Sequence, residues 1–153
     1  MSYIINQVNG LNEEKFLELY ETNKETIEQN TGHSSFENFR SKFFEVNNTT
    51  VEAVDSETGE VVGYGTGMVH DHNWLLIALI TKTTQIFMQL SGRPMHTFMI
   101  ANGINSISTM CIKDSPMYDV AINAGGHPDL YLPQEPIELQ NNFFNIRQIV
   151  LDV

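Results

Sequence analysis

The chain has 153 residues, of which 41% are hydrophobic and 10% aromatic, as is typical of one globular domain with a hydrophobic core. Lys and Arg number 8 against 19 Asp and Glu, which makes the net charge −11. This balance argues against broad nucleic-acid binding and against adhesion to an anionic membrane, because no basic stripe is present. We expect a single domain over residues 1–153.

Targeting signals and cysteines restrict the setting further. The first ten residues, MSYIINQVNG, lack the basic and long apolar regions of a secretion signal. The longest apolar block, WLLIALI, is too short to span a bilayer, so we expect a cytoplasmic protein. The single cysteine, Cys111, excludes a disulfide framework and a cysteine zinc site. It lies in ISTMCI, which predicts a buried and unreactive thiol.

The first half of the chain predicts a strand, two helices and three further strands. The strand covers residues 2–8, and the first helix covers 11–30 with Asn12 as its N-cap. The second helix covers 36–46, and its four phenylalanines are expected to join the core. Residues 49–87 are rich in Val, Ile and Thr and contain two turn signals, DSETGE and HDHN. They predict an antiparallel meander of three strands.

The second half alternates helices and strands. A helix is expected over residues 94–103, ending at Gly103, and a strand over 106–112. Another helix is expected over 116–125, with Ser115 as N-cap and Pro116 in the first turn. Strands are expected over 129–132 and 141–153. This order predicts a mixed α/β sheet, antiparallel in its first part and parallel across the helical crossovers, with helices on both faces.

The stretch QLSGRP, residues 89–94, is a candidate phosphate-binding turn. Small residues let backbone N–H groups converge on an anion at the start of a helix, and Gln89, Ser91 and Gly92 suit this geometry. Pro94 suits it less well, because proline has no N–H to offer.

With this motif, the element order resembles the GNAT N-acetyltransferase superfamily over nearly the whole chain. In that family the fourth strand runs into Gln or Arg, two residues, Gly, one residue, then Gly or Ala. Here Gln89 and Gly92 match, and Pro94 occupies the last position. The resemblance implies acetyl-CoA as cofactor, with Gln89, Leu90, Ser91, Gly92 and Arg93 along its pyrophosphate. It implies transfer of an acyl group to an amine, and a final β-hairpin.

The chain departs from the family pattern at the residues that do the chemistry. Many members carry a Tyr four residues before the last glycine, where this chain has Ala121 or Ile122. Tyr118 lies about one turn too early and is the candidate acid, or a structural tyrosine. Many members carry a Glu on the fourth strand, whereas residues 74–87 contain no carboxylate. Glu52, and beside it Asp55, are candidate bases only by default.

The histidines offer a second kind of site. His70 and His72 would share one face of a strand and could hold a metal or act as a base. They flank Asp71 in a predicted turn without a third ligand, so an exposed hairpin tip is the competing interpretation. We expect no metal, and structural roles for His96 and His127.

Two functions of different classes remain open. One is acetyl-CoA-dependent N-acyl transfer, weak or intact, to an amine substrate. The other keeps the fold and loses the chemistry, as in the degenerate GNAT-like internal virion and assembly proteins of tailed phages, which this chain also resembles. Such a protein would act through a protein partner, in virion assembly or as a homo-oligomer. The apolar strand at residues 141–153 is a candidate for pairing with another chain.

Overall fold

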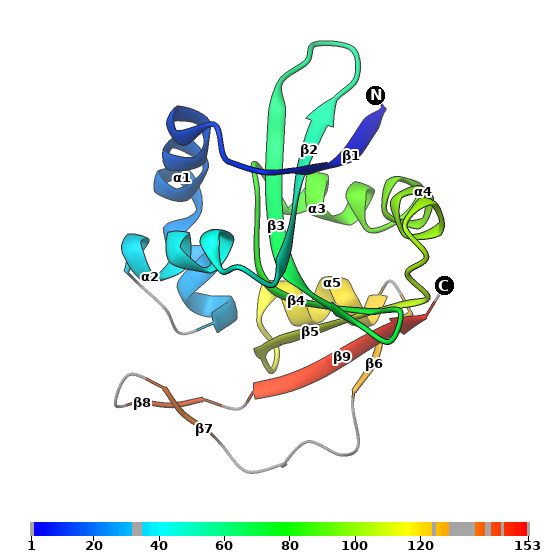
Figure 1. Cartoon of the computed structure of the whole chain (residues 1–153). Helices are drawn as coiled ribbons and strands as arrows, with labels where there is room; N and C mark the ends of the chain where they lie inside the picture. The colour runs from blue at the N-terminus through cyan, green and yellow to red at the C-terminus, as the bar shows by residue number, and fades with distance from the viewer. Residues whose placement is uncertain are drawn as a thin grey trace.

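A computed structural model describes residues 2–31, 35–123, 125–128, 137–139, 142–144 and 146–152 (Figure 1). The elements, in chain order, are β1 (Tyr3–Val8), α1 (Glu13–Thr31), α2 (Phe36–Ser41), the 3-10 turn η1 (Lys42–Phe44), β2 (Asn48–Asp55), β3 (Val61–His70), β4 (Asn73–Thr81), α3 (Thr84–Leu90), α4 (Arg93–Ala101), β5 (Ser106–Ile112), α5 (Pro116–Asn123), β6 (His127–Pro128), β7 (Ile137–Leu139), β8 (Asn142–Phe144) and β9 (Ile146–Asp152). The seven-stranded sheet has the order β1-β2-β3-β4-β5-β9-β6. Only β4 and β5 are parallel neighbours among these described strands. The mixed α/β sheet predicted from the sequence is confirmed, with a parallel pair across the first crossover and antiparallel pairs of β9 with β5 and β6 after α5.

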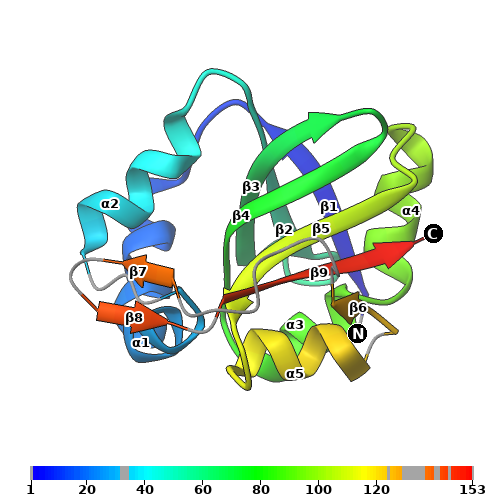
Figure 2. The same ribbon diagram turned by 90° about the horizontal axis from the view of Figure 1, so that it is seen from below.

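Two separate cores cover the two faces of the sheet. Helices α1 and α2 close one face with a cluster of aromatic rings, in which Phe16, Phe39 and Phe43 are buried beside Tyr64 of β3. Helices α3 and α4 close the other face (Figure 1). On this face Phe98 packs against Trp74. Helix α5 packs against α1 and α3, beside β5 and β9 (Figure 2).

Local signals set the helix boundaries as predicted. The Asn12 side chain accepts a hydrogen bond from the Lys15 N–H at 3.2 Å, and Ser115 accepts one from the Tyr118 N–H at 3.3 Å. Gly103 has φ 67°, and the Ile104 N–H donates to the carbonyl of Met99 at 2.9 Å, which closes the end of α4. The first helix, the α4 stop and the α5 cap are therefore confirmed.

Two predicted boundaries are wrong. The second helix ends at Ser41 and tightens into η1, so Val46 lies outside it and is 97% exposed. Phe44, expected in the core, is 49% exposed and stacks on Arg40. The strand predicted up to residue 87 stops at Thr81. The Thr83 side chain accepts a hydrogen bond from the Ile86 N–H at 3.1 Å, and this N-cap starts α3 where threonines suggested a strand.

A β-bulge in β4 bends the middle of the sheet. Gly67 of β3 pairs with Leu76, and Thr66 pairs with Ala78, so Ile77 is an extra residue in β4. Because one extra residue reverses the alternation of side chains, Leu76 faces the α3–α4 core while Ala78 faces the α1–α2 core. The pairing of β4 with β5 ends at this place, with Leu76 opposite Thr109. Beyond it the two parallel strands diverge.

The last strand lies inside the sheet. β9 pairs along β5 from Ser106–Asp152 to Ile112–Ile146, and β6 pairs on its other side through two residues (Figure 2). β5 therefore occupies one edge of this strand, and its pairing with another chain stays a prediction. β7 and β8 form a separate two-stranded sheet, and the strand predicted over 129–132 lies outside the described residues. Within the described part of the chain, no helix is both long enough and apolar enough to cross a membrane.

Candidate functional site

The opening between β4 and β5 is the candidate site, because two parallel strands diverge there at the centre of the sheet. β5 stays with β9, while β4 stays with β3 and turns away after Leu76. In the described part of the chain, the main-chain groups of residues 77–81 that face away from β3 have no strand partner. Such groups can bind a ligand that lies between the strands.

Three side chains fill this opening. Leu79 of β4, Phe87 of α3 and Met117 of α5 line two cavities, one toward α1 and one toward β5. Each cavity has a volume of about 40 Å³. A water molecule in the liquid occupies about 30 Å³, and pockets for small-molecule ligands measure about 300–1,000 Å³. Neither cavity, taken by itself, reaches the size of such a ligand pocket.

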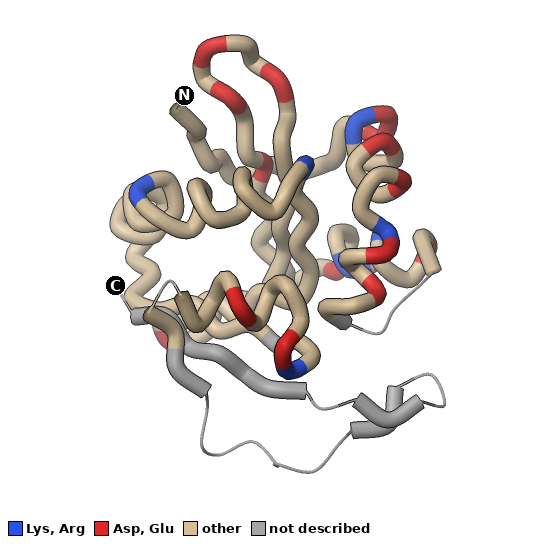
Figure 3. The backbone as a smooth tube through the Cα atoms, turned by 180° about the vertical axis from the view of Figure 1, so that it is seen from behind, with Lys and Arg blue, Asp and Glu red and all other residues tan. Residues whose placement is uncertain are grey.

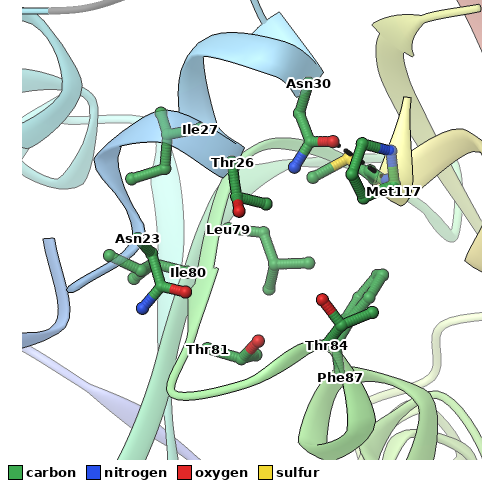
Figure 4. A pocket seen from close by; sticks show the side chains of 11 residues that line it. Asn23, Thr26, Ile27, Asn30, Leu79, Ile80, Thr81, Thr84, Phe87 and Met117 are labelled. Atoms are coloured by element: carbon green, nitrogen blue, oxygen red, sulfur yellow. Dashed lines mark hydrogen bonds between the residues drawn. The ribbon is translucent and has the colours of Figure 1, made fainter.

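The cavity toward α1 has a polar rim without a charge (Figure 4). Its lining residues are Asn23, Thr26, Ile27 and Asn30 of α1, Leu79, Ile80 and Thr81 of β4, Thr84 and Phe87 of α3, and Pro116 and Met117 of α5. The hydroxyl and amide groups of this rim can form hydrogen bonds with a neutral ligand. They include no carboxylate or imidazole that could act as a general base.

Asn30 closes the cavity at the start of α5. Its Oδ1 accepts a hydrogen bond from the Met117 N–H at 2.9 Å, and Asn30 is buried (Figure 4). This contact satisfies one of the free N–H groups at the N-terminus of α5 and joins that helix to α1. Thr109, the last residue of β5 that pairs with β4, lies on the other side of the opening, with its hydroxyl 3.5 Å from the Met117 sulfur. Asn30 thus contacts the main chain of Met117, and Thr109 contacts its side chain.

The predicted phosphate-binding turn has a different structure. Residues 89 and 90 form the last turn of α3, and the Ser91 N–H donates to the carbonyl of Phe87 at 3.0 Å. The Gly92 N–H donates to the carbonyl of Gln89 at 3.4 Å. The N–H groups of Ser91 and Gly92 therefore complete the end of α3 and are not free for an anion, whereas the assignment of Gln89, Leu90 and Arg93 to a pyrophosphate stays a prediction. The side chains of Gln89 and Arg93 line a groove beside β1, away from the opening.

The candidate acid and bases do not line either cavity of the opening. Tyr118 is half-buried and packs on the cluster of Cys111, Met117 and Ala121. Glu52 accepts a hydrogen bond from the Tyr64 hydroxyl at 2.8 Å, and that hydroxyl in turn accepts one from the Asn12 N–H at 3.0 Å. Burial is the largest cause that raises the pKa of Tyr64 to about 12. The pair thus supports the start of α1.

The carboxylate of Asp55 has a structural role. It accepts hydrogen bonds from the N–H groups of Glu57 and Thr58 at 2.9 and 3.4 Å, and so shapes the turn between β2 and β3. Cys111 is buried as predicted, and burial raises the pKa of its thiol to about 12. Such a thiol is a poor nucleophile at neutral pH.

The histidines form a hairpin tip, as the competing interpretation proposed. Asp71 and His72 have φ 49° and 64°, which is a turn with both central residues in the left-handed region. The His72 ring lies 3.0 Å from the carbonyl of Gly103 through Nδ1, and His70 is exposed. Among the described residues, no three His, Cys, Asp or Glu side chains are grouped to hold a metal ion.

The sequence did not point to the residues that shape this opening. Asn30, Thr84 and Met117 lie in three different helices, and none belongs to a recognisable motif. Thr83 carried a usable signal, since a threonine before an apolar stretch is a frequent N-cap.

Comparison with solved structures identifies the fold. No protein-family model and no curated protein matches the chain. An acetyl transferase from Salmonella typhimurium, which modifies the N-terminal serine of a 50S ribosomal subunit protein, is 9% identical with a TM-score of 0.72, over 100% of this chain and 96% of its own. An N-acetyltransferase from Staphylococcus aureus Mu50 is 12% identical with a TM-score of 0.70, and the match covers 99% of this chain and 98% of that protein. A Bacillus subtilis acetyltransferase in complex with CoA is 13% identical with a TM-score of 0.61, over 99% of each chain. The chain therefore has the GNAT N-acetyltransferase fold, with the parallel pair β4–β5 at its centre.

Proposed function

We propose that this chain is an acetyltransferase-like protein of the GNAT fold in which acetyl-CoA-dependent transfer to an amine is weak or lost, and which acts by binding a partner. The observation that carries the proposal is the filled opening between β4 and β5. Leu79, Phe87 and Met117 leave cavities of about 40 Å³ where an acyl-CoA would have to lie. Shared fold alone does not decide the function, because function depends on the site.

The chemistry of the opening supports the same proposal. Acyl transfer to an amine needs a base for the amine and an acid for the departing thiolate. The described rim offers only amides and hydroxyls, Glu52 is bonded to Tyr64, and Tyr118 lines neither cavity. The end of α3 uses the amides of Ser91 and Gly92 internally. A non-catalytic role in virion assembly, which the resemblance to phage proteins implies, is one form of this function.

The second candidate is an N-acyltransferase with residual activity. The bulge at Ile77 and the separation of β4 from β5 favour it, because they present unpaired main-chain groups between the strands. Met117 is the side chain that would have to move, and methionine changes rotamer readily. In this case a cationic amine would suit the acidic protein, whose net charge is −11.

Calorimetric titration with acetyl-CoA separates the two candidates. The proposal predicts that the wild-type protein does not bind acetyl-CoA up to about millimolar concentration, which corresponds to a binding free energy of roughly −4 kcal/mol. It also predicts that no CoA thiol is released when polyamines or N-terminal peptides are offered as acceptors. The variant Met117→Ala removes a filling side chain, and Met88→Ala, at a 55% exposed position on α3, is its control. Binding by Met117→Ala alone would identify the filled opening as the block. Wild-type binding in the micromolar range with thiol release would establish the enzyme instead.

A further inference from the structure

A groove of about 840 Å³ runs between strand β1 and helix α4, separate from the opening between β4 and β5. Its lining shares no residue with the two small cavities. All residues from Ser2 to Gln7 line it in unbroken sequence. Alternate side chains of a strand point to opposite faces, so a groove on one face would be lined by every second residue. This groove therefore follows the backbone edge of β1.

The edge that faces the groove carries unpaired backbone groups. β1 is the first strand of the sheet, paired only with β2 among the described strands. The Ser56 N–H donates to the Ser2 carbonyl at 2.9 Å, so Ser2 and Ser56 form a hydrogen-bonded pair of the antiparallel ladder. Because hydrogen-bonded and non-hydrogen-bonded pairs alternate, Ile4 and Asn6 bond to β2, while Ile5 and Gln7 direct their N–H and C=O groups outward.

This edge lacks the features that protect exposed strands. The sequence of β1, YIINQV, contains no charge and no proline. The opposite wall is α4, which contributes Thr97, Phe98 and Ala101. The groove thus offers a row of hydrogen-bonding groups on one side and a mixed polar and apolar wall on the other.

One charged residue lines the groove. Arg93, in the first turn of α4, is exposed and has no ion pair among the described residues. Figure 3 shows that acidic residues gather on α1 and on the hairpin of β2 and β3, whereas α4 carries none. A guanidinium with free donors beside a strand edge matches a carboxylate on an extended chain.

We propose that this groove binds an extended peptide segment of a partner protein, which adds to β1 as a further strand and places a carboxylate on Arg93. Main-chain hydrogen bonds to Ile5 and Gln7 would supply affinity, and the arginine would select acidic sequences. The residues Gln89 and Arg93 thereby gain a role different from phosphate binding. A second copy is disfavoured as the occupant, since each copy carries a net charge of −11. The inference does not rest on the state of the opening between β4 and β5.

The test uses a display library of random hexapeptides selected against the full chain, followed by synthesis of the enriched sequences. We expect them to contain β-branched residues and at least one Asp or Glu. Arg93→Gln should weaken their binding about tenfold or more, as expected for loss of a hydrogen bond to a charged group. Thr97→Trp places a bulky ring in the groove opposite β1 and should abolish binding. Ile100→Trp, on the same helix at a 71% exposed position outside the lining, should leave binding unchanged.

Amide hydrogen exchange gives a second readout that distinguishes strand addition from binding by side chains alone. In the free protein the N–H groups of Ile5 and Gln7 should exchange faster than those of Ile4 and Asn6, and the peptide should slow them. Circular dichroism of each variant checks the fold. The proposal is overturned if no acidic peptide is enriched, if Thr97→Trp binds as the wild type does, or if the peptide leaves both amides unprotected. A concentration-dependent dimer that protects the same amides would overturn it in favour of a second copy.

Discussion

Gly67 lies so close to the main chain of Leu75 that a Cβ added at Gly67 would be 1.9 Å from the Leu75 carbonyl oxygen. The contact lies beside the bulge in β4, where Ile77 is the extra residue. The bend that separates β4 from β5 therefore depends on a glycine in the neighbouring strand, because only a residue without a side chain admits the bulged strand so closely.

Substitution of this glycine should unfold the centre of the sheet. We expect Gly67→Ala to lower the free energy of unfolding by about 3 kcal/mol or more, since the obstructing atoms are backbone and cannot move aside. Gly65→Ala is the control, because its Cβ would lie 3.4 Å from the Leu79 side chain, an ordinary contact. Urea denaturation of both variants measures the difference. Equal stability of the two would show that the bulge adapts to a side chain.

The contact between Asn30 and Met117 should stabilise the junction of α1 and α5. Asn30→Ala leaves the Met117 N–H without its partner in a buried place, at a cost of about 1–3 kcal/mol. Asn23→Ala is the matched control on the same helix, where the side chain bonds only to the carbonyl of Leu19 four residues earlier. The two variants are compared by thermal unfolding and by hydrogen exchange at Met117. Unchanged exchange of this amide in Asn30→Ala would contradict the prediction.

Tyr64 should make stability depend on alkaline pH. Its pKa is raised from 10.0 to about 12, with burial as the largest cause, so the folded protein keeps the phenol neutral longer than the unfolded chain does. Stability from this group is complete below about pH 10 and is lost as pH rises toward 12. Absorbance at the tyrosinate band should show a late ionisation that Tyr64→Phe removes.

The same variant supplies the comparison for the pH dependence. Tyr64→Phe should cost about 1–2 kcal/mol at neutral pH, because Glu52 and the Asn12 N–H lose their partner. It should show a smaller loss of stability between pH 10 and 12 than the wild type does. The Cys111 thiol, whose pKa is also raised, affects both proteins alike and cancels in the difference. A wild-type curve parallel to that of the variant would contradict the assignment.

Pro94→Ala tests the phosphate-binding interpretation directly. Pro94 lies in the first turn of α4, so alanine adds one N–H there and should change stability by less than about 1 kcal/mol. We expect no acetyl-CoA binding by this variant at about millimolar concentration, because the amides of Ser91 and Gly92 remain bonded at the end of α3. Calorimetry of wild type and variant side by side measures it. If Pro94→Ala bound acetyl-CoA about tenfold more tightly than the wild-type protein, the phosphate-binding interpretation would be supported instead.

Several features of the fold could be predicted from short stretches of sequence. The caps at Asn12 and Ser115 and the stop at Gly103 were predictable because each depends on hydrogen bonds and backbone angles within four or five residues. Apolar periodicity and turn signals predicted the order of helices and strands. That order, with the partial motif at Gln89 and Gly92, was enough to indicate the GNAT fold that the solved structures then showed.

The site could not be predicted in the same way. The bulge at Ile77 depends on the register of two strands, and the contact of Asn30 with Met117 joins residues 87 positions apart. The helix over 84–90 buries Leu90 against the core, and this packing outweighed the strand preference of Thr84. The orientation of Gln89 and Arg93 toward β1 followed from that helix. Local rules determined where elements begin and end, whereas packing between distant residues decided which side chains meet, because its energy depends on partners that no short window of sequence contains.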